Sequence, residues 1–311
     1  MDPVASFNPN TSLGGLQIGV LVSYVLFGVT TTQTYIYYSR FPQDSRKIKA
    51  LVALVWICEA AHVISVGDGL YDYTITNYGN PERLGGAMPK SLFASLLFGG
   101  VIAVSVQGFF TWRTYTFSNK LFIPLLISAM ILVRMIGSTV LAVMGFRMTL
   151  LAPFEKQWGS LFTALFIISA IIDLTITVTL VVFLRNRRNV AHERTMALID
   201  KLIKWTIETA LLTSAASMVT LACFITMKQN LIWVATFLVT TRLFSNSFLA
   251  SLNSRQTLRE MDQATRPTGP SLASAFGPST STNIQMTKVT QITYDTEPHG
   301  GIDSKVVSVE V

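Results

Sequence analysis

Seven long runs of apolar residues divide this chain, and their length constrains its fold more than any other feature of the sequence. Each run is about 20 residues long, which is the length that an α-helix needs to cross a hydrocarbon core roughly 30 Å thick. Short polar, charged or proline-bearing breaks separate the runs. We predict membrane spans near residues 13–38, 48–72, 90–112, 122–145, 159–184, 203–226 and 230–252.

The composition agrees with an integral membrane protein. Half of the residues are hydrophobic and only 13% are charged, and the mean hydropathy is +0.47. The seven runs are continuously apolar and lack the alternation of membrane strands, so a β-barrel is excluded. The predicted fold class is therefore all-α: a polytopic membrane protein built as a seven-transmembrane helix bundle over residues 13–255.

Lys and Arg indicate the orientation of this bundle, because positively charged loops are retained in the cytoplasm. They concentrate on one predicted side, in residues 40–49, 113–120, 185–204 and 255–259. The other side holds only Arg83, Lys90, Arg147, Lys156 and Lys228. We expect the N-terminus outside and the C-terminus in the cytoplasm, in the plasma membrane or another membrane of the secretory pathway.

The two ends of the chain are predicted to lie outside the bundle. Residues 1–12 form a short extracellular or lumenal arm in which the sequon Asn10-Thr11-Ser12 makes Asn10 a glycosylation candidate. Residues 256–311 are rich in Ser, Thr, Pro and Gly, and they bury too little apolar surface to offset their chain entropy. We expect a disordered cytoplasmic tail.

The formal net charge of +7 is explained by the membrane. The basic residues cluster at the predicted inner edges of the spans, where anionic lipid head groups attract them. We therefore expect the lipid bilayer as a partner, no nucleic acid, and a possible cytoplasmic partner at the inner basic loops and the tail.

Ionisable residues inside the second predicted span are candidates for function, because a charge at the bilayer centre is costly and marks proton or ligand sites. Glu59 and His62 are three residues apart and share one helix face, so a hydrogen bond between them is feasible. Asp68 and Asp72 lie near the predicted outer mouth. The four residues are candidates for ligand binding or proton coupling. A Glu59–His62 pair that only satisfies itself is the alternative.

Other intramembrane charges are predicted to form structural pairs that fix helix order. Arg134 and Asp173 both lie near mid-span, and Glu208 and Arg242 lie within about one helical turn of each other in depth. We expect each of these two couples to pair. Gln107 and Asn246 are expected to form hydrogen bonds between helices.

Several chemistries are excluded by missing residues. Only one histidine, His62, lies in a span, so no metal site is expected. No Gly-x-Ser-x-Gly elbow and no phosphate-binding glycine loop occurs. Every Lys lies in a loop, at a helix end or in the tail, which excludes a retinal Schiff base. We expect no catalytic residues, no cofactor and no enzyme activity.

A resemblance adds to this reading. The stretches "GVLVSYVLFGVTTTQTYIYYSRFPQDSRKIKALVALVWICEAAHV" and "LIDKLIKWTIETALLTSAASMVTLACF" resemble a large family of fungal, mainly basidiomycete, seven-span proteins. That family carries a C-terminal domain of unknown function (of the 6534 type) over roughly the last three helices. The resemblance spans residues 13–259 and includes polar landmarks in register: Gln33, Tyr35, Phe41, Asp44, Lys49, His62, Tyr78, Asp173, Glu208, Thr209, Thr213, Asn246, Leu252, Asn253 and Arg255.

The resemblance implies a seven-helix membrane protein and no particular activity. The sequence departs from the family pattern at Ala210, where Gly is frequent, and at Phe244, where Tyr is common.

Three functional hypotheses remain. The first is a receptor-like signalling protein that binds an unknown ligand near Asp68, Asp72 and the following loop, and presents its inner loops and tail to a partner. The second is a transporter of a small solute, coupled to protons through Glu59 and His62. The third is a structural membrane scaffold without a ligand.

Overall fold

The computed structural model describes residues 9–78, 80, 88–118, 121–148, 150–188, 193–227 and 230–264. These residues belong to one compact unit, residues 1–266. The first eight residues of the predicted arm and the tail from residue 265 lie outside the described residues.

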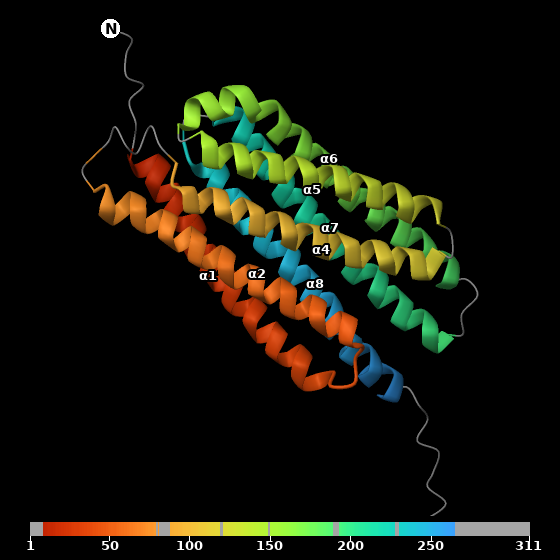
Figure 1. Ribbon diagram of the computed structural model, residues 1–311. Coiled ribbons are helices and arrows are strands. Elements are labelled where there is room, and N and C mark those ends of the chain that lie inside the picture. Colours follow the sequence, from red (N-terminus) through yellow and green to blue (C-terminus); the bar gives the residue numbers. More distant parts are fainter. Residues whose placement is uncertain are drawn as a thin grey trace, which may run out of the picture. The chain divides into compact units, whose positions relative to one another are not determined.

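Long α-helices make up nearly all of the described chain (Figure 1). A short π-helix, η1 (Asp72–Thr76), continues α2. Seven helices are long and apolar enough to cross a membrane, and no strand occurs among the described residues. The predicted all-α fold of a multi-pass membrane protein is confirmed. The seven helices are α1 (Pro9–Arg40), α2 (Arg46–Tyr71), α4 (Lys90–Ser118), α5 (Phe122–Arg147), α6 (Leu151–Arg188), α7 (Glu193–Thr226) and α8 (Ile232–Ala264).

Helices α1 and α8 extend past the predicted limits of the bundle, residues 13–255. Helix α1 begins at Pro9, so Asn10 of the predicted arm lies in its first turn; the Asn10 side chain is outside the described residues. Helix α8 continues to Ala264, so residues 256–264 are helical, although the sequence placed them in a disordered tail. This segment is rich in good helix formers, and Gln256 Nε2 donates to Glu260 Oε1 at 2.7 Å, one turn away.

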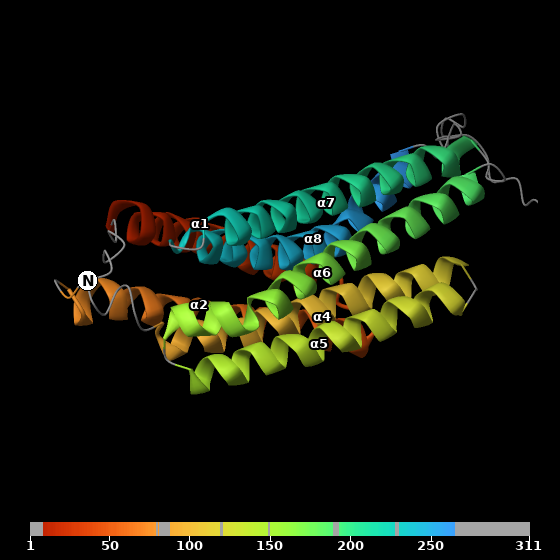
Figure 2. The same cartoon turned by 90° about the horizontal axis from the view of Figure 1, so that it is seen from above.

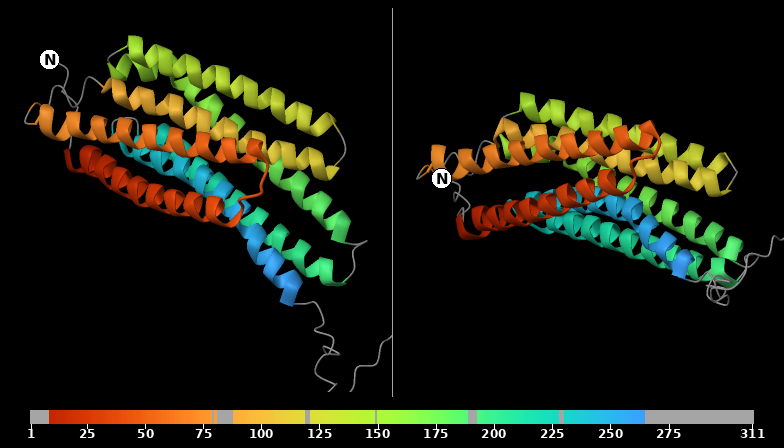
Figure 3. Two further views of the ribbon diagram at one scale, coloured as in Figure 1. Left: turned by 60° about the horizontal axis from the view of Figure 1, so that its bottom comes forward. Right: turned by 90° about the horizontal axis from the view of Figure 1, so that it is seen from below.

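The helices form two layers joined at both sides. Helices α1, α8 and α7 lie side by side in one layer, and α2, α4 and α5 lie in the other (Figures 2 and 3). Helix α6 packs on both α7 and α5, while α1 contacts α2 at the opposite side. The C-terminal ends of α1, α4, α6 and α8 lie at one end of this bundle, which we call the tail end.

Helix α8 is the central element of the bundle. It contacts α1, α2, α4 and α7, and its contact with α1 is the most extensive between any two helices of the described chain. Of the residues in its most apolar window, 67% are buried, against 22% to 50% for the other six helices, although α8 is the least apolar of the seven. A helix surrounded by protein can carry polar groups that lipid would exclude.

Buried side chains of α8 contribute to two apolar clusters at different depths. One contains Leu231, Trp233 and Leu238 with Phe162 and Phe224. The other lies nearer the tail end and contains Phe244, Phe248 and Leu252 of α8 with Tyr37 and Phe41 of α1. Arg242 lies between them along α8 and is fully buried. The fold therefore places a buried cation at the centre of the bundle, where it needs protein partners.

The tail end of α8 is tied to the turn between α1 and α2. Arg255 makes a bidentate contact with Asp44, with Nη2 at 2.5 Å from Oδ2 and Nη1 at 3.3 Å from Oδ1. Tyr37 donates to Asp44 Oδ2 at 3.0 Å, and the Arg255 guanidinium lies 4.4 Å from the centre of the Phe41 ring. Several polar landmarks of the resemblance thus gather at this turn and stabilise it.

Candidate functional site: buried charges and the cavities beside them

Arg242 forms the centre of a buried polar cluster that links α8 with α1 and α2. Its Nη1 forms an ion pair with Glu59 Oε2 and donates to the Glu59 carbonyl at 3.2 Å. Its Nε donates to Ser23 Oγ at 2.8 Å, and its Nη2 lies 2.8 Å from His62 Nδ1. Ser245 donates to Glu59 Oε1. We call Ser23, Glu59, His62, Arg242 and Ser245 the Arg242 cluster.

The contact with Arg242 defines the protonation state and the tautomer of His62. A guanidinium can only donate hydrogen bonds, so His62 Nδ1 must accept and the imidazole is neutral with its proton on Nε2. No hydrogen-bond partner of Nε2 is found. Glu59 and His62 do not bond to each other as the sequence suggested, because each contacts Arg242 instead.

Every member of the Arg242 cluster is fully buried. None of the five residues lines any of the four cavities described below. The charges of this buried cluster compensate each other, and its contacts connect three helices.

The predicted pairing of Glu208 with Arg242 is wrong. Glu208 is more than half exposed, and its carboxylate lies 3.8 Å from Lys204 Nζ on the same helix. The prediction compared only how far along their helices the two residues lie, and those positions are compatible with a pair. The direction in which Glu208 projects from α7 depends on the rotation of the helix about its axis, which position along the helix does not reveal.

Asp68 and Asp72 lie away from the described cavities. Asp68 is exposed and Asp72 is half-buried at the start of η1, where its carbonyl accepts from Asn77. Neither lines a described cavity. Most of the following loop, which was expected to complete a ligand site with them, lies outside the described residues.

Arg134 and Asp173 are connected through Gln107 rather than by direct contact. Arg134 Nη1 donates to Gln107 Oε1 at 2.9 Å, and Gln107 Nε2 donates to Asp173 Oδ1 at 2.8 Å. The amide of α4 therefore bridges the cation of α5 and the anion of α6. Gln107 and Asn246 both form hydrogen bonds between helices, and Asn246 donates to the Leu26 carbonyl of α1 at 3.3 Å.

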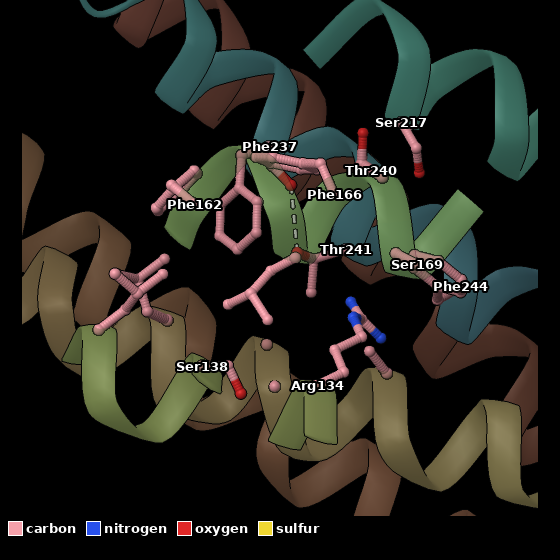
Figure 4. Close-up of a pocket in the computed structure, with 16 residues that line it drawn as sticks. Arg134, Ser138, Phe162, Phe166, Ser169, Ser217, Phe237, Thr240, Thr241 and Phe244 are labelled. Atoms are coloured by element: carbon pink, nitrogen blue, oxygen red, sulfur yellow. Dashed lines mark hydrogen bonds between the residues drawn. The ribbon is translucent and has the colours of Figure 1, made fainter. Parts of the chain in front are cut away.

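This bridged pair borders a cavity, which we call cavity A. Its volume is about 70 Å³, and α4, α5, α6, α7 and α8 all contribute to its wall. Figure 4 shows the Arg134 guanidinium extending from α5 toward Thr241 and Phe244 of α8, and it lies 6.0 Å from the centre of the Phe244 ring. The aromatic wall consists of Phe162, Phe166, Phe237 and Phe244, and the hydroxyl groups are those of Ser138, Ser169, Ser217, Thr240 and Thr241.

A second cavity, cavity B, adjoins cavity A at Phe244, which lines both. Its volume is about 40 Å³, and α4, α6, α7 and α8 form its wall. Gln107 and Asp173 line it, and Asp173 Oδ2 is buried without a hydrogen-bond partner. The bridged pair thus presents its cation to cavity A and its anion to cavity B.

Two further cavities continue this series toward the tail end. Cavity C has a volume of about 360 Å³ and shares Phe110, Thr206 and Thr209 with cavity B. Cavity D, of about 330 Å³, shares Arg113, Leu202 and Ser251 with cavity C. Neighbouring cavities with common wall residues form a track along α8, on the side facing α4 and α7.

Sequence reasoning missed the serines of the Arg242 cluster and the cavities beside Arg134. Ser23 and Ser245 carry no signal that separates them from other Ser and Thr residues of the spans. Within the described part of the chain, no three His, Cys, Asp or Glu side chains come close enough to hold a metal ion.

Comparison with known proteins identifies one domain. Residues 169–257 match a family of unknown function, DUF6534. This stretch covers most of α6, all of α7 and most of α8, in agreement with the expected domain of unknown function over the last three helices. The match supports neither the fungal origin nor the placement of the whole chain in a seven-span family. No curated protein and no solved structure matches the chain.

Proposed function

We propose that this integral membrane protein is receptor-like and binds a small amphipathic molecule in cavity A. The observation that carries the proposal is the composition of the cavity wall: one guanidinium, five hydroxyl groups and four phenylalanine rings around a cavity of about 70 Å³. Small-molecule sites likewise combine apolar walls with a few polar groups.

The charge of the wall favours an anionic or strongly hydrogen-bond-accepting head group. Arg134 is the only charged residue that lines cavity A, and a guanidinium binds carboxylates through paired N–H donors. Phe162, Phe166 and Phe237 would contact the apolar body of the ligand. The sequence-based placement of the ligand near Asp68 and Asp72 is therefore replaced by a site deeper in the bundle.

The position of cavity A suits signalling, because both helix layers contribute to its wall. A ligand there would bias the packing of α5 and α6 against α7 and α8. The basic segment at residues 185–204 and the tail after α8 would then present the response to a cytoplasmic partner. In this proposal the N-terminus lies outside the cytoplasm, the protein resides in the plasma membrane or another membrane of the secretory pathway, and it has no enzymatic activity.

The test compares three probes with one apolar body and different heads: 4-phenylbutyrate, 4-phenylbutanol and 4-phenylbutylamine. The full chain is placed in lipid nanodiscs and its thermal midpoint is measured. We expect the carboxylate to raise the midpoint most, because it can bind the Arg134 guanidinium through paired N–H donors. A ligand at 100 times its Kd stabilises the folded state by about 2.7 kcal/mol.

Two variants connect the effect with cavity A. Arg134→Gln should abolish the carboxylate preference, whereas Arg147→Gln, an exposed arginine on the same helix, should retain it. Gly99→Leu fills the cavity and leaves Arg134 in place, since a Cβ at Gly99 would meet only ordinary contacts of 3.4 Å and longer. Equal shifts for the three probes, or equal responses of the two arginine variants, would refute the proposal.

A transporter is the second candidate, and the track of cavities A to D favours it. Shared wall residues lead from mid-span toward the tail end. Such a transporter would not use Glu59 and His62, which are sealed. Uptake of radiolabelled 4-phenylbutyrate into liposomes that contain the protein would favour transport, while binding without flux would favour the receptor.

A further inference from the structure

Cavity B contains a buried carboxylate oxygen without a hydrogen-bond partner. Asp173 is 8% exposed; its Oδ1 accepts from Gln107 at 2.8 Å, while its Oδ2 lacks a hydrogen-bond partner. Leaving a buried polar atom unsatisfied costs free energy, more so for a charged group. The Asp173 carboxylate lines cavity B, so a guest in this cavity could satisfy it.

The threonine hydroxyl groups of the cavity wall do not supply the hydrogen-bond donor that Asp173 Oδ2 lacks. Each of four hydroxyl groups donates its single hydrogen to a backbone carbonyl of its own helix: Thr177 to Asp173 at 2.7 Å, Thr206 to Leu202 at 2.7 Å, Thr209 to Trp205 at 2.8 Å and Thr213 to Ala210 at 3.2 Å. A hydroxyl group that has donated its hydrogen can only accept. Cavity B therefore combines one carboxylate with several acceptors.

The amide of Gln107 does not satisfy the second oxygen of Asp173. Its Nε2 has two N–H groups and donates to Asp173 Oδ1, but no hydrogen bond reaches Oδ2, and its Oε1 accepts from Arg134. Arg134 lines cavity A and does not line cavity B. An anion in cavity B would face the Asp173 charge, while a cation with several N–H groups would match the wall.

We propose that cavity B is a binding site for an ammonium group, either free ammonium or the head of a primary amine, held by Asp173 Oδ2 and the threonine hydroxyls. Three or four N–H donors directed at a carboxylate and surrounding hydroxyl oxygens form charge-assisted hydrogen bonds. The rings of Phe110 and Phe244 also line the cavity, and aromatic faces attract cations.

This site is independent of the proposed function of cavity A. It takes the opposite charge, lies on the other side of the Gln107 bridge, and holds whether or not cavity A binds an amphipathic anion. Failure of the carboxylate test above leaves the ammonium site standing, and failure of the test below leaves cavity A standing.

The experiment measures the thermal midpoint of the full chain in nanodiscs with rising concentrations of four chloride salts at constant ionic strength. Ammonium and methylammonium should raise the midpoint in a saturable way. Sodium and tetramethylammonium, which carry the same charge without N–H donors, should not. A further titration with butylammonium separates the two sources: tighter binding than ammonium indicates an amine head group, and weaker binding indicates free ammonium.

Variants of the wall connect the effect with cavity B. Asp173→Asn should abolish the ammonium shift, and Asp68→Asn, an exposed aspartate of α2, should leave it unchanged. Thr209→Val keeps the shape of the side chain and removes one acceptor, so it should weaken apparent ammonium affinity about three- to tenfold. This second variant keeps the test decisive if Asp173→Asn fails to fold.

Three outcomes would overturn the proposal. The first is the absence of any ammonium shift in the wild-type chain, as expected if the cavity holds water or Asp173 carries a proton. The second is an equal shift with tetramethylammonium or sodium, which indicates a general salt effect. The third is an unchanged ammonium response in both Asp173→Asn and Thr209→Val.

Discussion

At the scale of single residues, the buried charges of this protein differ in how completely neighbouring groups compensate them. Arg242 is fully buried, and its guanidinium N–H groups contact Glu59, Ser23 and His62. Arg134 and Asp173 are satisfied less completely, because an amide separates them and one carboxylate oxygen remains without a hydrogen-bond partner. The first arrangement lines none of the four described cavities, and the second borders two of them. On this contrast we base the proposal of a structural role for the first and a binding role for the second.

The Glu59–Arg242 pair leads to a prediction about stability. Glu59→Gln or Arg242→Met should each lower the free energy of unfolding by about 3–5 kcal/mol, since each leaves an uncompensated buried charge. The double variant should lose less than the sum of the two, with a coupling of about 0.5–3 kcal/mol. Unfolding by SDS in mixed micelles measures all three, with the exposed Glu208→Gln as the control expected to change by less than about 0.5 kcal/mol.

Gln107 provides a second prediction at this scale. Gln107→Leu keeps a similar volume but removes the amide between Arg134 and Asp173, so both lose a hydrogen-bond partner. We expect a loss of about 1–3 kcal/mol in the free energy of unfolding. The same SDS unfolding assay applies, and a variant as stable as the wild type would show that the bridge carries no stabilisation.

At the scale of elements, the packing of α8 against α1 organises the bundle. A Cβ at Gly19 of α1 would lie 2.5 Å from the Cβ and 2.7 Å from the Cα of Ala235. The absence of a side chain at Gly19 therefore lets the two backbones approach closely, as small residues do in membrane helix pairs. This approach brings Ser23, one turn further along α1, within reach of Arg242.

Two glycines of α1 give a matched test. Gly19→Ala should destabilise the protein by about 1–3 kcal/mol, because the neighbouring atoms belong to a backbone that can only move by separating the helices. Gly28→Ala has nothing within 4 Å of the new Cβ, and it should be neutral or stabilising by up to about 1 kcal/mol through helix propensity. The thermal midpoints of both variants test this prediction; destabilisation of equal size would show that close packing at Gly19 is not the cause.

At the scale of the whole molecule, the two sides of α8 differ in character. Toward α1 and α2 it is sealed by the Arg242 cluster, and toward α4 and α7 it borders the track of cavities. We propose that the contacts on the first side fix helix order, so that the side with cavities could accommodate a guest without loss of the bundle. The tail end is additionally held by the Asp44–Arg255 contact.

The orientation of the bundle in the membrane is a prediction at this scale. Seven spans place the two chain ends on opposite sides, and the distribution of Lys and Arg directs the C-terminus to the cytoplasm. An epitope tag before Met1 should be accessible on intact cells or, for an internal membrane, protected within the lumen of sealed vesicles. A tag after Val311 should be accessible from the cytosol. Detection of both tags on the same side would contradict seven spans.

The sequence by itself determined the number, kind and approximate bounds of the helices. Each span depends on the match between one apolar run and the bilayer thickness, which is a property along the chain alone. The sequence also indicated which residues would be too costly to expose to lipid, including Glu59, His62, Asp173 and Arg242. The burial of these four groups agrees with that cost, whereas Glu208, which was predicted to be buried on the same ground, is more than half exposed.

Only the tertiary structure decided which of these groups meet. Glu208 has a depth suitable for Arg242 and still faces outward, whereas Glu59 reaches Arg242 because α8 packs against both α1 and α2 at that level. Such pairing depends on the rotation of each helix and on the order of its neighbours, and both arise from contacts between residues far apart in the sequence. For the same reason the cavities beside Arg134 and Asp173, which carry both proposed sites, are a property of five packed helices and of no single one.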